Sequence, residues 1–137
     1  IQGIDANKNG IRDDVELAIF KAYPESAKTR AVLLQYALAL QMEVIQEVVN
    51  KEVVVAVVQE EDRADICIAD TIAPRKTPES SREYSDIEKI DVYINFVEKI
   101  QFNIDERKRN RTNFYEKIGS YNSLPRKCDI DYSLLPN

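Results

Sequence analysis

The residues best suited to chemistry lie near the start of the sequence, where oxygen-bearing side chains alternate along a short polar segment. Asp5, Asn7 and Asn9 occupy every second position, and Gly10 follows directly. Calcium is a hard cation that takes six to eight oxygen ligands, and alternating side chains can curl round one ion where a glycine permits a sharp bend. This spacing therefore predicts a site for a hard cation, with calcium as the expected cofactor.

Residues 5–16 read DANKNGIRDDVE, which resembles the calcium loops of the EF-hand, dockerin and thrombospondin type 3 class. The resemblance implies a bend at Gly10, a backbone carbonyl ligand at Ile11 and a bidentate carboxylate at Glu16 in the first turn of the next helix. Asp13 would bind directly or through water. The complete implied ligand set is Asp5, Asn7, Asn9, Ile11, Asp13 and Glu16.

The loop departs from the EF-hand pattern in one position. Arg12 stands where an EF-hand has an apolar residue, and the apolar Ile11 comes one residue earlier, which fits thrombospondin-like and dockerin-like bacterial loops better. The four residues before Asp5 leave no room for an entering helix unless the native chain extends further upstream, so we expect a structural site and not the opening of paired hands. The alternative is an Asn-rich turn that caps the next helix without any ion.

The first fifty residues also indicate a compartment. A calcium loop, a Tyr23-Pro24 break and an Ala/Leu-rich helix in this order look like a class of uncharacterised secreted or periplasmic bacterial proteins, which implies a location but no activity. Cys67 and Cys128 lie 61 positions apart and form no CxxC pair. They are either a disulfide or two reduced thiols, and we expect the disulfide because the calcium loop also points to an oxidising compartment.

The amino-acid composition limits the number of domains, the kinds of catalysis and the classes of partner that we expect. The chain has 137 residues, of which 44% are apolar and 31% charged, so we expect a single helical domain over residues 1–137. It contains no histidine, which excludes Ser-His-Asp and Cys-His catalysis and histidine metal sites, and we therefore expect no enzyme. A net charge of -5 argues against a nucleic-acid partner, and no apolar run approaches the ~20 residues of a membrane span.

Apolar periodicity predicts an all-α fold. The predicted helices cover residues 13–23, 26–50, 51–71 and 80–118, followed by an extended tail over residues 119–137. Ser80 or Ser81 is the expected N-cap of the fourth segment. The apolar stripe of that segment has a/d spacing and comprises Ile87, Ile90, Ile94, Val97 and Ile104, with Gln101 at one a position.

Helix lengths decide between a rod and a bundle. A straight hairpin of residues 26–71 and 80–118 would place residue 118 roughly 50 Å from Cys67. The ten residues from 118 to Cys128 span at most about 35 Å, so a straight hairpin and an intramolecular disulfide are incompatible. We therefore expect breaks near residues 50–51 and within residues 103–113, giving a bundle of four or five helices. The alternative is a rod that buries its apolar surface in a homodimer.

Two charged blocks lie in the middle and late parts of the chain. Residues 43–65 hold seven acidic side chains, and residues 107–127 hold seven basic ones with Glu116 as the only acid. The basic block is interpreted as a solvated helix end, and phosphate binding is the alternative. The acidic block either packs against it inside the bundle or faces a partner, and the run Glu60-Glu61-Asp62 is expected to be solvated.

These features favour a non-enzymatic, calcium-stabilised, periplasmic or secreted protein that binds another protein, as inhibitors, immunity factors and accessory proteins do. The partner is not identified by the sequence. The alternative is a self-associating structural helical protein. A carboxylate-based hydrolase is the third possibility, and it would require acidic side chains that converge on a pocket.

Overall fold

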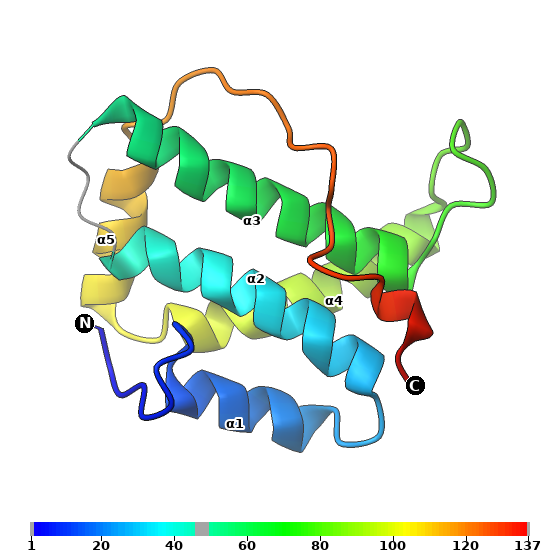
Figure 1. The fold of residues 1–137 in the computed structure, drawn as a ribbon, viewed down its shortest axis with the longest axis horizontal. Helices are drawn as coiled ribbons and strands as arrows, with labels where there is room; N and C mark the ends of the chain where they lie inside the picture. The colour runs from blue at the N-terminus through cyan, green and yellow to red at the C-terminus, as the bar shows by residue number, and fades with distance from the viewer. Residues whose placement is uncertain (1, 46–49, 137) are drawn as a thin grey trace.

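The computed structural model of the protein describes residues 2–45 and 50–136, which form five α-helices and a short 3-10 helix without any strand. The helices are α1 (Asp13–Ala22), α2 (Ala27–Ile45), α3 (Lys51–Ile72), α4 (Tyr84–Gln101), α5 (Asp105–Tyr115) and η1 (Tyr132–Leu134). The predicted all-α bundle of four or five helices is therefore confirmed (Figure 1).

Helix α2 is the centre of the bundle and contacts every other helix. Figure 1 shows it between α1 and α3, with α4 behind and α5 across one end. Its apolar residues surround the helix, and Val32, Leu33, Tyr36 and Leu40 are at most 1% exposed. A helix that is apolar on most sides is stable only when neighbours cover all of those sides, which explains this central position.

Helices begin or end at both of the predicted breaks. Asn50 caps α3, because its side chain accepts a hydrogen bond from the amide of Val53 at 2.9 Å. Residues 102–104 separate α4 from α5, at the start of the interval where the second break is expected. Helix α2 is described as far as Ile45, and the rest of its predicted extent, residues 46–49, lies outside the described residues.

The tail returns across α3 and is held by the predicted disulfide. Cys67 of α3 is bonded to Cys128, with their Cα atoms 5.1 Å apart. Gln35 of α2 adds two hydrogen bonds, donating to the carbonyl of Lys127 at 2.8 Å and accepting from the amide of Asp129 at 3.0 Å. Covalent and polar contacts together fix the tail on the α2–α3 surface.

The N-cap predicted for the fourth segment is wrong. Ser80 does not cap a helix, because its hydroxyl group bonds with Thr77 inside the preceding loop, and α4 begins at Tyr84 with Glu83 as N-cap. The a/d stripe is also only partly buried, since Ile87 and Ile104 are 46% and 40% exposed while Ile90 and Val97 are in the core. An a/d seam presumes one partner along its whole length, whereas α4 divides its contacts among α1, α2 and α3.

None of the described helices combines the length and the apolar character needed to cross a membrane.

Candidate functional site

The loop before α1 is bent by two residues in the left-handed backbone region. Lys8 has φ +56° and Gly10 has φ +88°. Glycine at position 10 is needed for a second reason, because a Cβ atom there would lie 2.6 Å from a side-chain carbon of Leu38 on α2. The bend predicted at Gly10 is therefore present, and it presses the loop against the central helix.

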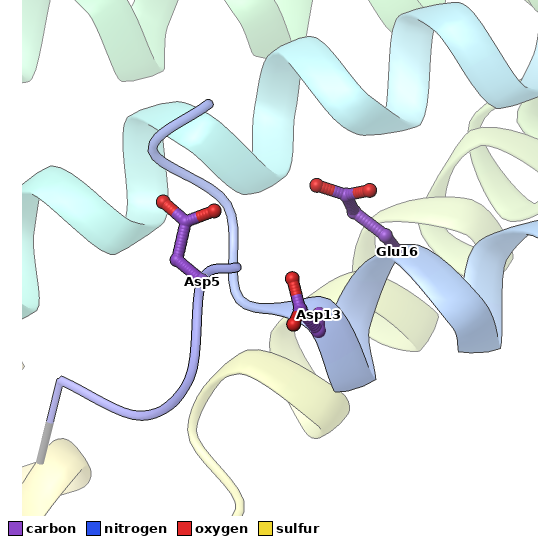
Figure 2. A group of neighbouring side chains, drawn as sticks. All are labelled: Asp5, Asp13 and Glu16. Atoms are coloured by element: carbon purple, nitrogen blue, oxygen red, sulfur yellow. The ribbon is translucent and has the colours of Figure 1, made fainter. Parts of the chain in front are cut away.

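Three carboxylates meet at the mouth of this loop. Asp5 comes from the loop, while Asp13 and Glu16 lie three residues apart in the first turn of α1 and share one face. Figure 2 shows the three side chains pointing toward a common space, and one carboxylate oxygen of each lies within 4.8 Å of the others. None of the three forms an ion pair with a described lysine or arginine, so their mutual repulsion is not offset by a protein cation.

Hydrogen bonds wrap the loop around the Asp5 carboxylate. Its two oxygens accept from the amide of Asn9 at 3.2 Å and from the amide of Gly10 at 2.9 Å. The Asn9 side chain in turn accepts from the amide of Ile11 at 3.0 Å. These local bonds hold three of the predicted ligand residues in one turn.

The asparagine side chains lie beside the same carboxylates. Asn7 donates to both oxygens of Glu16 at 3.4 and 3.5 Å, and Asn9 donates to one of them. An asparagine amide offers an oxygen as well as a nitrogen, so a rotation about the last side-chain bond replaces the donor with a ligand atom. The fold thus brings Asp5, Asn7, Asn9, Asp13 and Glu16 together, and their role as metal ligands stays a prediction.

Ile11 and Arg12 attach the loop to the bundle. The Ile11 side chain is 6% exposed and belongs to the main core, while its carbonyl stays a predicted ligand only. Arg12 is 1% exposed and donates to the carbonyls of Gln101 at 3.0 Å and Ile100 at 3.1 Å, which end α4. Its guanidinium group also pairs with Asp14 at 2.8 Å. Arg12, the residue that departs from the EF-hand pattern, therefore anchors the loop to the end of α4.

A second polar cluster, the Arg111 network, lies inside the bundle and was not predicted as a site. Arg111 of α5 contacts a carboxylate from each of three other helices: Glu43 of α2 at 3.3 Å, Glu61 of α3 at 3.1 Å and Glu98 of α4 at 3.2 Å. The acidic and basic blocks thus pack against each other, one of the two alternatives left open by the sequence. The expectation that Glu61 is solvated is wrong, since its side chain is 14% exposed.

Burial changes the ionisation of this network. The Glu43 side chain has no exposed surface, and burial, followed by a hydrogen bond with Glu61 and its charge, raises the pKa of Glu43 far above its usual range. Burial also raises the pKa of Asp65 on α3 to about 6, with the charges of Glu61 and Glu98 next in importance. This shift favours the neutral form of Glu43, and in that form two carboxylates face one guanidinium group.

Comparisons with protein-family models, with curated proteins and with solved structures give no match for this chain. Its function is therefore inferred from the side chains that the fold brings together.

Proposed function

We propose that residues 5–16 bind one calcium ion and that this ion fastens the amino-terminal segment to the bundle. The observation that carries the proposal is the group of three carboxylates, Asp5, Asp13 and Glu16, whose oxygens lie within 4.8 Å of one another and form no ion pair with a lysine or arginine that the structure describes. A divalent ion offsets this repulsion, and an all-oxygen donor set suits a hard ion. The ion would supply charge and cross-linking only, without a catalytic step.

The position of the loop supports a structural role. Its backbone touches α2 at Leu38, its Ile11 side chain enters the core, and Arg12 bonds to the end of α4. A cation held between the loop and the first turn of α1 would stabilise all of these contacts in the folded state. Extracellular calcium sites of this kind have affinities of about 10⁻⁴–10⁻³ M.

Calorimetry with calcium tests the site directly. The wild type should release or absorb heat with a stoichiometry of one, and Asp5→Asn and Glu16→Gln should each weaken binding at least about tenfold, since each removes a charged ligand. Glu52→Gln is a matched control, because Glu52 is an exposed acid in the first turn of α3 outside the cluster. Equal heats for the wild type and Glu16→Gln would contradict the calcium site.

We further propose that the protein acts outside the reducing cytosol by binding another protein. The disulfide supports an oxidising compartment. Leu17 and Phe20 on the outer face of α1 are 71% and 48% exposed, and they line a hollow of about 420 Å³ with Asp13 and Glu16. Exposed apolar side chains in a hollow are typical of a protein interface.

A pull-down from periplasmic extract tests the partner. The wild type should recover a stoichiometric protein, and a Leu17→Ser/Phe20→Ser double variant should lose it. Leu134→Ser is the control, because Leu134 is 81% exposed at the opposite end of the chain. No stoichiometric protein in the wild-type sample would count against this part of the proposal.

Self-association is the second candidate, and α4 carries the observation that favours it. Tyr84, Ile87 and Val92 of this helix are 77%, 46% and 63% exposed. A second copy of the chain would cover such a surface in a homodimer. Light scattering between micromolar and millimolar protein concentrations separates the candidates, since a monomer throughout the range excludes self-association.

A further inference from the structure

A pocket separate from the calcium loop opens where α4 turns into α5. Its volume is about 520 Å³, and its lining residues are Asn95, Glu98, Lys99, Phe102, Asn103, Lys108 and Arg111. Sites for small molecules commonly enclose about 300–1,000 Å³. The spacing of the residues from α4 and from α5 puts each set on one helix face, so the two helices form opposite walls.

The walls carry more positive than negative charge. Lys99 and Lys108 form no ion pair with any described residue, and both are exposed at the rim. Asn103 accepts a hydrogen bond from Arg107 at 2.6 Å through its oxygen, which leaves its amide protons available. These groups are all hydrogen-bond donors, and together they suit an anion.

Arg111 supplies a further donor from the inner wall. Its Nη2 atom donates to Glu61, Glu98 and Tyr115, and its Nε atom faces Glu43. Nη1 makes no hydrogen bond to any residue that the structure describes. The guanidinium group is held rigidly by these contacts and by the Phe102 ring, whose centroid lies 4.6 Å away. A fixed, partly buried donor at the base of a cationic pocket is well placed for a carboxylate ligand.

Glu98 restricts the class of anion. One of its oxygens, Oε1, already accepts from Tyr36 at 2.7 Å and from Arg111 at 3.2 Å, while Oε2 accepts no hydrogen bond from a described residue. A carboxylate in the wall repels a bare anion but accepts a hydrogen bond from a hydroxyl group. The ligand therefore needs an anionic group for the lysines and Arg111, and a hydroxyl group for Glu98.

We propose that the α4–α5 pocket binds a small organic anion that carries hydroxyl groups, as sugar acids do. Lys99, Lys108 and Arg111 Nη1 contact the anionic group, the two asparagine amides donate to further oxygens, and Glu98 Oε2 accepts from a hydroxyl group. The pocket and the calcium loop have no proposed ligand residue in common, so each site can be altered by substitution without removing a ligand of the other.

Titration of the ¹⁵N-labelled full-length protein with D-glucuronate tests the proposal. The measurement uses two-dimensional amide spectra at constant ionic strength and 1 mM calcium, with sorbitol and sulfate as the neutral polyol and the bare anion. Glucuronate should cause saturable shifts that centre on Asn95, Asn103 and Lys108, while sorbitol should cause none and sulfate should bind at least tenfold more weakly. Absence of saturation by glucuronate, or equal binding of sulfate, would overturn the proposal.

Matched lysine variants test whether the two lysines of the pocket bind glucuronate. Lys99→Gln/Lys108→Gln should weaken glucuronate binding at least about tenfold, because it removes two charge-assisted contacts. Lys89→Gln should bind as the wild type does, since Lys89 is an exposed lysine of α4 outside the pocket. Both variants change only exposed side chains, so folding is preserved, and an unchanged affinity in the double variant would also overturn the proposal. Calcium heats should be equal in all three proteins.

Discussion

The guanidinium group of Arg12 caps the carboxyl end of α4, where its Nη1 atom donates to the backbone carbonyl of Gln101 at 3.0 Å. The last carbonyls of a helix have no partner within the helix, and here a residue 89 positions earlier in the chain provides one. The same side chain belongs to the candidate calcium loop. Through this contact the loop and the end of α4 are parts of one polar junction.

Replacement of Arg12 should therefore destabilise the whole fold. We expect Arg12→Met to lower the free energy of unfolding by about 2–4 kcal/mol, because it keeps the apolar stem but leaves buried carbonyls without a donor. Arg109→Met should change it by less than about 0.5 kcal/mol, since Arg109 is exposed on α5. Urea denaturation measures both, and equal midpoints for the two variants would refute the capping role.

The effect of Glu16→Gln on the free energy of unfolding should depend on calcium: the substitution should destabilise the protein only when calcium is bound. Without calcium the substitution removes one of three repelling carboxylates, so stability should be unchanged or slightly higher. At calcium concentrations of 100 times the dissociation constant the wild type should gain about 2.7 kcal/mol, and the variant should gain much less. Thermal unfolding with and without calcium measures the difference. If the loop were only a helix cap, calcium would not separate the two proteins.

The disulfide should account for a large share of the stability. The bridge closes a loop of 61 residues, so Cys67→Ala/Cys128→Ala should lose about 4 kcal/mol in the chain-entropy model. Amide exchange of residues 120–136 should accelerate, because the tail loses its covalent link to α3. A reductant should shift the midpoint of the wild type but not of the double variant. A wild type that resists reductant under unfolding conditions would contradict this expectation.

The fold could be predicted from the sequence where one local signal determines an element. Asn50 is a good N-cap and the Cys67–Cys128 bridge limits how far the tail can extend, so the break before α3 follows from short-range chemistry and chain geometry. Ser80 has an equally good cap composition, yet its hydroxyl group bonds with Thr77 in the preceding loop. The residue type alone therefore does not show whether a serine hydroxyl group bonds to the following helix or to the preceding loop.

The calcium loop and the Arg111 network also differ in how far their members can be predicted from the sequence. The ligand residues of the calcium loop lie within twelve positions, so their spacing alone predicts that they meet. The Arg111 network takes one side chain from each of four helices, and only the packing of those helices brings them together. The opposite charges of the two blocks indicated an internal contact between them but not its members, and Glu61 was expected to be solvated.

Glu43 should make the protein less stable as the pH rises. Its pKa is raised in the folded state above the ordinary value of 4.5, chiefly by burial, so the folded protein binds more protons than the unfolded chain. The free energy of unfolding then falls with increasing pH between the unfolded pKa and the folded one. Asp65 contributes in the same direction. Because its pKa is about 6, it is almost fully ionised at pH 7, and it adds little further change in stability above that pH. The decline between pH 7 and 9 is therefore assigned to Glu43.

Glu43→Gln isolates this effect, because glutamine resembles the neutral acid in shape and carries no charge at any pH. We expect the variant to have a nearly constant free energy of unfolding between pH 7 and 9, and to exceed the wild type by more at pH 9 than at pH 7. Glu88→Gln, an exposed acid of α4, should follow the wild-type curve. Urea denaturation at each pH gives the three curves. A wild-type stability that does not fall over this range would show that Glu43 is ionised in the folded protein, with Arg111 compensating for its buried charge.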